Sequence, residues 1–173
     1  MRKTVIGVMG PREAKDADLK SAFELGRLIA KEGWILLSGG GNEGVMEAVN
    51  KGAKQEGGTT VGIIWLDHTL DTSDSVDIAI VSGMGSARNN INVLSSDVVV
   101  ACGLGAGTAS EIALALKARK PVVLLSQEEL TKTFFKKLGK ELVSPADTPH
   151  EAVEITKKLL STKSHAGAGR AGL

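Results

Sequence analysis

Short runs of apolar, mostly β-branched residues recur along the chain, and segments with a helical pattern lie between them. The runs are nearly continuous rather than alternating, which is typical of strands that are buried on both faces of a sheet. A weaker run of the same kind is Leu142-Val143. The clear runs are residues 5–9, 35–37, 61–64, 78–81, 98–102 and 122–125.

Three segments have the spacing of an amphipathic helix. In the first, apolar and small residues follow the i, i+3, i+4, i+7 pattern, and Asp16 or Asp18 can serve as its N-cap. Thr108 is placed to cap the second, and Pro149 with Glu151 opens the third. The expected buried faces are Leu19, Ala22, Phe23, Gly26, Ile29 and Ala30 in the first helix, Ala109, Ile112, Ala113 and Leu116 in the second, and Ala152, Ile155 and Leu159 in the third.

Alternating strands and helices indicate a parallel sheet with helices on both of its faces. We therefore predict a Rossmann-like, three-layer α/β/α fold with a mainly parallel sheet of about six or seven strands, whose order the sequence leaves open. Residues 1–161 are expected to form a single ligand-binding domain. Residues 162–173 are rich in small residues and have no periodicity, so we expect a flexible C-terminal tail.

Composition narrows the possible functions. The 173 residues include 21 Lys or Arg and 20 Asp or Glu, and there is no Tyr, so the chain lacks the basic and aromatic surface that nucleic acid requires. The single cysteine, Cys102, excludes an internal disulfide and a thiolate zinc cluster, and the three histidines are too scattered to predict a metal site. No segment is long and apolar enough to span a bilayer or to act as a signal peptide. We expect a cytoplasmic protein without nucleic-acid or membrane partners.

Glycine is the informative excess, because ten of its 21 copies gather in short clusters directly after predicted strands. The carboxyl ends of parallel strands meet at one edge of the sheet, which is where open α/β sheets bind ligands. Glycine lets a ligand approach the backbone, and each loop leads into a helix whose N-terminus favours an anion. One such loop is an ordinary tight connection, but several at one edge predict a cleft for an anionic ligand. The clusters are Gly10-Pro11 and residues 38–44, 83–86 and 103–108.

Common nucleotide motifs fit this pattern poorly. Gly39, Gly41 and Gly44 have the spacing of a dinucleotide fingerprint, but they follow the second strand instead of the first. A Walker A loop is absent, because Gly139-Lys140 is followed by Glu instead of Ser or Thr. Cys102 is either a thiolate ligand for a bound metal or, more simply, a small apolar residue at the end of a buried strand.

Residues 105–111, Gly-Ala-Gly-Thr-Ala-Ser-Glu, resemble the G-x-G-T-x-x-E motif of the Lonely Guy family of phosphoribohydrolases, which act on cytokinin nucleotides. Arg88 precedes Glu111 by the spacing that this family uses between its active-site Arg and Glu. Two positions depart from the enzymes: Leu104 stands in a segment where they read Pro-Gly-Gly, and Asn89 stands where their Arg is followed by Lys.

Over nearly the whole chain, up to about Leu160, the sequence is more similar to the molybdenum cofactor carrier proteins of algae and cyanobacteria. The similarity is carried by residues 6–11, 33–37, 83–92 and 111–116. It implies a homodimer or homotetramer that binds the molybdopterin-based cofactor, protects it and releases it to acceptor enzymes, without catalysis. The alternative is a phosphoribohydrolase acting on nucleoside 5′-monophosphates, in which Arg88 and Glu111 are catalytic.

In the carrier interpretation, the glycine loops contact the pterin edge, and Arg88 and Arg12 bind anionic oxygens. No residue is assigned to catalysis or to a metal. The expected cofactor-binding residues are Gly10, Pro11, Arg12, Ser38, Gly39, Gly40, Gly41, Asn42, Gly44, Gly85, Ser86, Arg88, Gly105, Gly107, Thr108 and Glu111.

Overall fold

The computed structural model, which describes residues 2–125 and 128–168, contains a seven-stranded sheet in which all neighbouring strands are parallel. The predicted Rossmann-like α/β fold is confirmed, and each apolar run of the sequence is a strand. The strands are β1 (Val5–Met9), β2 (Ile35–Ser38), β3 (Thr60–Ile64), β4 (Ile78–Val81), β5 (Val98–Cys102), β6 (Val122–Leu125) and β7 (Val143–Ala146).

The strand order is β4-β3-β2-β1-β5-β6-β7. The chain builds the sheet outward from β1 to β4, then returns to the centre and builds the other half from β5 to β7. The order therefore reverses between β1 and β5, which are neighbours with Met9 opposite Ala101. A reversal of this kind leaves a crevice beyond the carboxyl ends of the two central strands, and ligands bind there in open α/β sheets.

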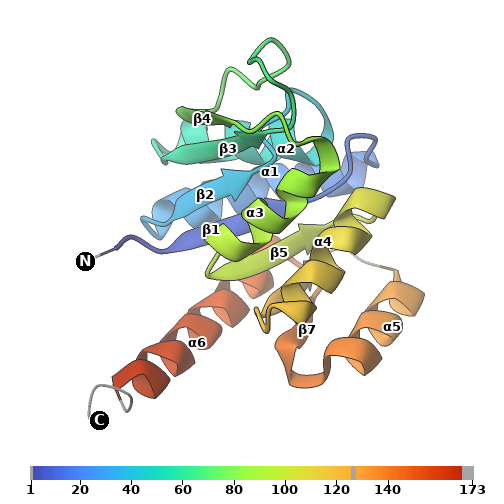
Figure 1. Ribbon diagram of the computed structural model, residues 1–173. Coiled ribbons are helices and arrows are strands. Elements are labelled where there is room, and N and C mark those ends of the chain that lie inside the picture. The colour runs from blue at the N-terminus through green and yellow to red at the C-terminus, as the bar shows by residue number, and fades with distance from the viewer. Residues whose placement is uncertain (1, 126–127, 169–173) are drawn as a thin grey trace.

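Helices cover both faces of the sheet (Figure 1). On one face, α1 (Asp16–Lys31), α2 (Gly44–Gln55) and α6 (Pro149–Ala168) pack over one apolar cluster. On the other, α3 (Arg88–Ser95), α4 (Ala106–Lys117) and α5 (Glu129–Gly139) pack over a second cluster. Side chains of β1 alternate between the two, with Val8 in the first and Met9 in the second. Short 3-10 turns, η1 (Gly85–Ala87) and η2 (Lys140–Leu142), precede α3 and β7.

The predicted N-caps are wrong. Lys15 occupies the N-cap position of α1, and Asp16 and Asp18 lie inside its first turn. Gly105 occupies that position in α4, so Thr108 is the third helical residue, and neither helix has a side-chain cap hydrogen bond. The buried face of α4 also differs, because it includes Thr108 and Glu111 while Ala113 is exposed. The helix directs polar side chains inward because, as described below, they line a cavity.

The third predicted helix, α6, begins at Pro149 as expected and continues to Ala168. The sequence predicts a flexible tail from residue 162 onward. In the structure residues 162–168 belong to α6, so the first part of this segment is helical. The absence of apolar periodicity in this part of the sequence does not exclude a helix, because alanine and lysine have high helix propensity without any apolar pattern. Residues 169–173 lie outside the described residues.

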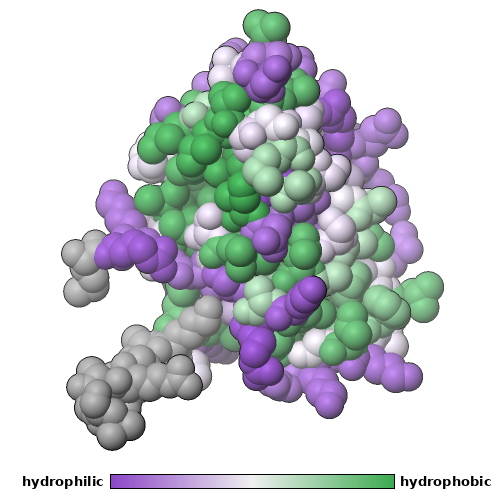
Figure 2. Space-filling model, viewed as in Figure 1, coloured by the Kyte–Doolittle hydropathy of each residue, from purple (hydrophilic) through white to green (hydrophobic). Residues whose placement is uncertain are grey.

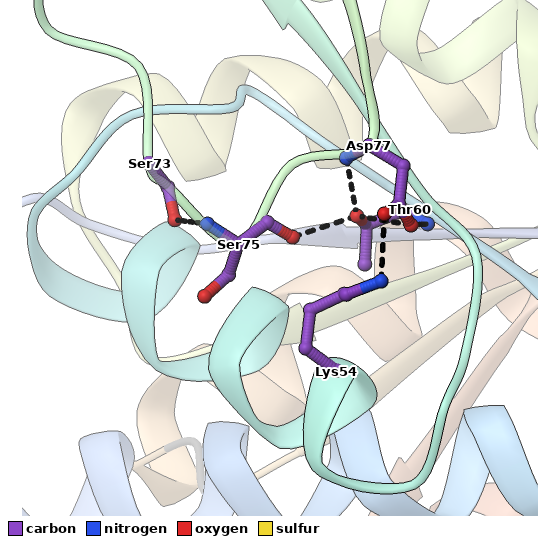
Figure 3. A network of polar contacts seen from close by, with 5 residues as sticks. All are labelled: Lys54, Thr60, Ser73, Ser75 and Asp77. Atoms are coloured by element: carbon purple, nitrogen blue, oxygen red, sulfur yellow. Dashed lines mark hydrogen bonds and ion pairs between the residues drawn. The ribbon is translucent and has the colours of Figure 1, made fainter.

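The segment that connects β3 to β4 is held by a polar network at the end that leads into β4 (Figure 3). Asp77 accepts hydrogen bonds from Thr60 N at 2.9 Å and from Lys54 Nζ at 2.6 Å, and Thr60 Oγ1 donates to Ser75 O at 2.7 Å. Nearer the site, Ser73 N donates to Gly40 O at 2.9 Å. The network therefore joins the ends of α2, β3 and β4 and holds the connecting segment against the loop that follows β2.

Candidate functional site

A cavity of about 390 Å³ lies at the carboxyl edge of the sheet, where the strand order reverses between β1 and β5. Its walls come from the ends of β1, β2 and β3, from the start of α3 and from the first turn of α4. The lining residues are Val8, Met9, Gly10, Pro11, Arg12, Gly39, Met46, Trp65, Gly85, Ser86, Arg88, Asn89, Gly105, Ala106, Gly107, Thr108 and Glu111.

Arg88 is anchored to the backbone at two strand ends. Its Nη1 donates to the carbonyl oxygens of Gly39 at 2.7 Å and Ile63 at 2.5 Å, after β2 and near the end of β3. Its Nε is buried and has no partner among the described residues. Burial lowers the pKa of Arg88, Glu111 opposes this effect, and Arg12 adds to it. An arginine side chain stays charged despite this lowering, so Arg88 brings a positive charge in a fixed position to the cavity wall.

Trp65, immediately after β3, forms part of the wall between two arginines. The guanidinium carbon of Arg12 lies 5.0 Å from its ring centroid and that of Arg88 lies 5.1 Å away, both within cation–π range. Arg12 is more exposed than Arg88 and forms an ion pair with Glu43, with Nε and Oε2 3.2 Å apart. The cavity thus contains two cations, one anchored and one at the rim.

The N-terminus of α4 supplies a further binding surface for an anion. Gly105, Ala106, Gly107 and Thr108 all line the cavity, and the first turn contains no acidic residue. N–H groups in a first helical turn have no partner within the helix and carry partial positive charge. Thr108 Oγ1 is buried without a partner among the described residues, and a Cβ on Gly107 would meet no atom within 4 Å. This turn therefore presents unused donors around open space.

Glu111 lies one turn further along α4 and is only 7% exposed. Its Oε1 accepts a hydrogen bond from Asn92 Nδ2 at 3.2 Å. Burial raises the pKa of Glu111 to about 7, and the Asn92 hydrogen bond and the charge of Arg88 only partly offset this effect. About half of the molecules therefore carry a neutral Glu111 near pH 7.

The structure brings most of the predicted site residues together, and the exceptions come from the loop after β2. Ser38 is buried, and its hydroxyl accepts hydrogen bonds from Gly40 N at 3.0 Å and from Asn50 Nδ2 at 3.1 Å, so it supports this loop instead of lining the cavity. The cavity-lining residues among those predicted are Gly10, Pro11, Arg12, Gly39, Gly85, Ser86, Arg88, Gly105, Gly107, Thr108 and Glu111; those outside the cavity are Ser38, Gly40, Gly41, Asn42 and Gly44.

The start of α2 is also unavailable to a ligand in the cavity. Val45 N donates to Pro11 O at 3.1 Å, and Asn42, Glu43 and Gly44 line a different hollow between α1 and α2. The sequence predicts an anion at the helix after residues 38–44 as at the other glycine loops, but here the N–H of Val45 is bonded to the loop after β1 and the residues before it lie outside the cavity.

Sequence reasoning missed the remaining lining residues, Val8, Met9, Met46, Trp65, Asn89 and Ala106. Met46 comes from α2, whose apolar pattern is interrupted by Asn50 and Gly52, both of them buried. Trp65 follows β3, a strand that no glycine cluster follows. The sequence does place Trp65 directly after an apolar run. That position alone predicts an aromatic ring at the carboxyl edge of the sheet, where the cavity lies.

Cys102 does not face the cavity. The thiol is fully buried, its Sγ lies 3.5 Å from Asp18 O, and burial raises its pKa to about 12. It is therefore a packed thiol and not a thiolate at neutral pH. Within residues 2–125 and 128–168, no group of three or more His, Cys, Asp or Glu side chains is arranged to hold a metal ion.

Comparison with known proteins places this chain in one family. The SLOG cluster4 family profile matches residues 3–153. The molybdenum cofactor binding protein of the phototrophic bacterium Rippkaea orientalis is 55% identical, with a TM-score of 0.91, and the match covers 92% of this chain and 99% of that one. The Moco carrier protein of Chlamydomonas reinhardtii is 52% identical, with a TM-score of 0.87, over 93% of this chain and 99% of that one.

A more distant relative is the cytokinin riboside 5′-monophosphate phosphoribohydrolase of Mycobacterium tuberculosis. It is 35% identical over 96 residues, which are 54% of this chain and about half (51%) of that enzyme's length.

Proposed function

Because the chain belongs to the SLOG cluster4 family, we propose that it binds the molybdenum cofactor as cargo, protects it and delivers it to acceptor enzymes. The supporting observation is that relatives more than 50% identical over nearly the whole chain are molybdenum cofactor binding or carrier proteins. The cavity agrees with this role, because its unused groups are hydrogen-bond donors and cations and it contains no acid other than Glu111 among its described lining residues.

The chemistry of the cargo fits these groups one by one. The cofactor carries a phosphate, a flat pterin ring with donors and acceptors along its edge, and a negatively charged dithiolene–metal head. The first turn of α4 suits a tetrahedral oxyanion, and the guanidinium of Arg88 adds a positive charge at the same cavity. Trp65 and Met46 provide flat and apolar surface for a ring system.

Hydrolysis of a nucleoside 5′-monophosphate fits less well. That reaction needs an ionised carboxylate to stabilise the oxocarbenium-like transition state at the sugar. Glu111 is the one cavity carboxyl among the described residues, and burial raises its pKa to about 7, so its surroundings disfavour the charge that this reaction needs. A carrier, in contrast, requires only contacts with the bound ground state. We therefore favour the carrier over the phosphoribohydrolase.

Anaerobic purification from a host that makes the cofactor tests the proposal. We expect molybdopterin and molybdenum in the wild-type protein, measured by fluorescence of the oxidised pterin and by elemental mass spectrometry. Gly107→Val should lose most of this cargo, because the new side chain fills the open space at the first turn of α4. Ala113→Val is the matched control, since it places the same side chain at an exposed position of the same helix that does not line the cavity.

The same preparations distinguish the enzyme. We expect the wild-type protein to release no adenine from AMP. Adenine release by the wild type that disappears in both Glu111→Gln and Arg88→Ala would replace the carrier function by the hydrolase function.

The proposal extends to assembly and location. We propose a homodimer or homotetramer, supported by an exposed apolar area on the edge strand β4 and on α3, which faces the viewer in Figure 2. We also propose a cytoplasmic location, where the lone thiol Cys102 stays reduced, and no nucleic-acid partner, in line with a net charge of +1. The described residues include no helix long and apolar enough to cross a bilayer. The exposed apolar area that supports an oligomer covers β4, α3 and the segment between them, and its residues are Ile78, Ile80, Val81, Met84 and Leu94.

A further inference from the structure

Glu111 is a buried acid in a cavity whose other described lining groups are neutral or cationic. Asn92 Nδ2 donates to one carboxyl oxygen, Oε1, and no described residue donates to the other, Oε2. Arg88 is the nearest cation, but its Nη1 is bonded to backbone carbonyls and the described side chains form no ion pair with Glu111. A buried carboxylate without a paired cation is costly, and an anion bound beside it would add repulsion.

We propose that Glu111 binds the anionic cargo as a neutral carboxylic acid, with Oε2–H donating a hydrogen bond to an anionic oxygen of the cargo. Loading then transfers one proton from solvent to the carboxylate wherever Glu111 is ionised before binding, and release returns it. This inference rests on the proposed carrier function, and it assigns to the acid of the cavity a role that needs no catalysis.

The surroundings of Glu111 support the acid form. The groups that face it are Arg88 and Asn92 from α3, with Arg12 further away beside Arg88. These groups favour the charged carboxylate, yet burial outweighs them and raises the pKa to about 7 even without cargo. An anion that engages Arg88 neutralises the main stabilising charge and adds a negative one, so the pKa rises further. By linkage, the cargo binds the acid form more tightly than the carboxylate form.

The sign of the pH dependence follows directly. Below pH 7 the acid form already dominates, so Glu111 adds no further pH dependence to the affinity there. Above pH 7 each pH unit removes about nine-tenths of the acid form, and the apparent Kd rises roughly tenfold per unit. In Glu111→Gln the amide N–H replaces the acid O–H as a donor at every pH, so the profile is flat. At pH 8 this variant should therefore bind about tenfold more tightly than the wild type.

Anaerobic titration calorimetry at pH 8, in two buffers of different ionisation enthalpy, measures the proton directly. The probe is molybdenum cofactor freshly released from a purified molybdoenzyme. We expect an uptake on the order of one proton per site for the wild type and none for Glu111→Gln. The cargo's phosphate does not contribute, because its second pKa is about 6. Glu154→Gln, which removes an exposed carboxylate on α6, is the matched control and should behave as the wild type.

Each outcome decides the question. Equal proton uptake in the wild type and Glu111→Gln refutes the inference while leaving the carrier function intact. Loss of binding by a folded Glu111→Gln at pH 6 also refutes it, because an amide donor would then not replace the acid. Failure of the wild-type protein to bind the cofactor at any pH refutes the carrier function, and the role of Glu111 with it.

Discussion

Arg88 reaches its position because residue 39 is glycine. A Cβ there would overlap Arg88 Nη1 and would lie 2.7 Å from Met46 Sδ, so any larger residue would displace the guanidinium from the carbonyls that hold it. Gly107 leaves space of a different kind, since a Cβ there would meet no protein atom. At the residue scale, one glycine makes room for a protein side chain and the other makes room for a ligand.

Glu111 also gives a prediction that needs no cargo. Burial raises its pKa from 4.5 to about 7, so the native state holds a proton that the unfolded chain releases in this range. The stability contribution of Glu111 is therefore complete below pH 4.5 and is lost as the pH rises through 7, by on the order of 3 kcal/mol. Denaturant unfolding at pH 5 and pH 8 should show this loss in the wild type and not in Glu111→Gln. The same pH dependence in both proteins would contradict a raised pKa.

Helices α1 and α2 approach each other closely through two glycines. A Cβ on Gly52 would overlap the carbonyl oxygen of Phe23, and one on Gly26 would overlap that of Val49. This contact sets how α2 lies on the sheet, and α2 carries Met46 into the wall of the cavity. At the element scale, backbone contact between two helices on one face therefore helps to shape a site at the edge.

Gly52→Ala tests this contact. We expect a loss of about 1–3 kcal/mol of unfolding free energy, because α1 and α2 must separate, and this cost exceeds the helix-propensity gain of about 1 kcal/mol. Gly107→Ala is the matched control, also in a helix but facing open space, and it should be neutral or slightly stabilising. Chemical denaturation measures both. Equal stability changes would show that α1 and α2 separate without cost.

At the scale of the whole molecule, the sheet has one edge whose side chains are left exposed. β4 ends the sheet on one side, and Ile78, Ile80 and Val81 on it are each 45–50% exposed. A parallel edge strand with this much apolar surface invites pairing unless something covers it. A second copy of the chain is the partner that the proposed oligomer supplies.

Ile80→Lys should shift the protein toward the monomer, because it places a charge in the centre of the apolar edge without removing a core residue. Light scattering after gel filtration measures the mass, and the melting temperature of the monomer should change little. Leu130→Lys, which changes a residue 82% exposed on α5, should leave the mass of the assembly unchanged. A shift in Leu130→Lys but not in Ile80→Lys would place the contact on the opposite side of the molecule.

The sequence by itself determined the strands, the parallel sheet and the edge at which the cavity lies. These features depend on local signals: continuous β-branched runs mark buried strands, and the glycine clusters after them mark the carboxyl edge. Gly107 and Glu111 were also identified from their motif, because its residues lie within a short loop and one helical turn, and Arg88 was identified from its spacing to Glu111 in the family that the motif resembles.

Only the tertiary structure decided the rest. Contacts between segments far apart in the chain decide the strand order and bring Trp65 and Met46 to the cavity. They also place most of the loop after β2 outside the cavity. The predicted N-cap of α4 is wrong for a related reason. Thr108 is the third residue of the helix and its side chain is buried, so it does not cap the N-terminus. The charge of Glu111 is the clearest case. A carboxyl group has its ordinary pKa in the sequence, and only burial beside an arginine whose Nη1 is already bonded to backbone carbonyls raises that pKa to about 7.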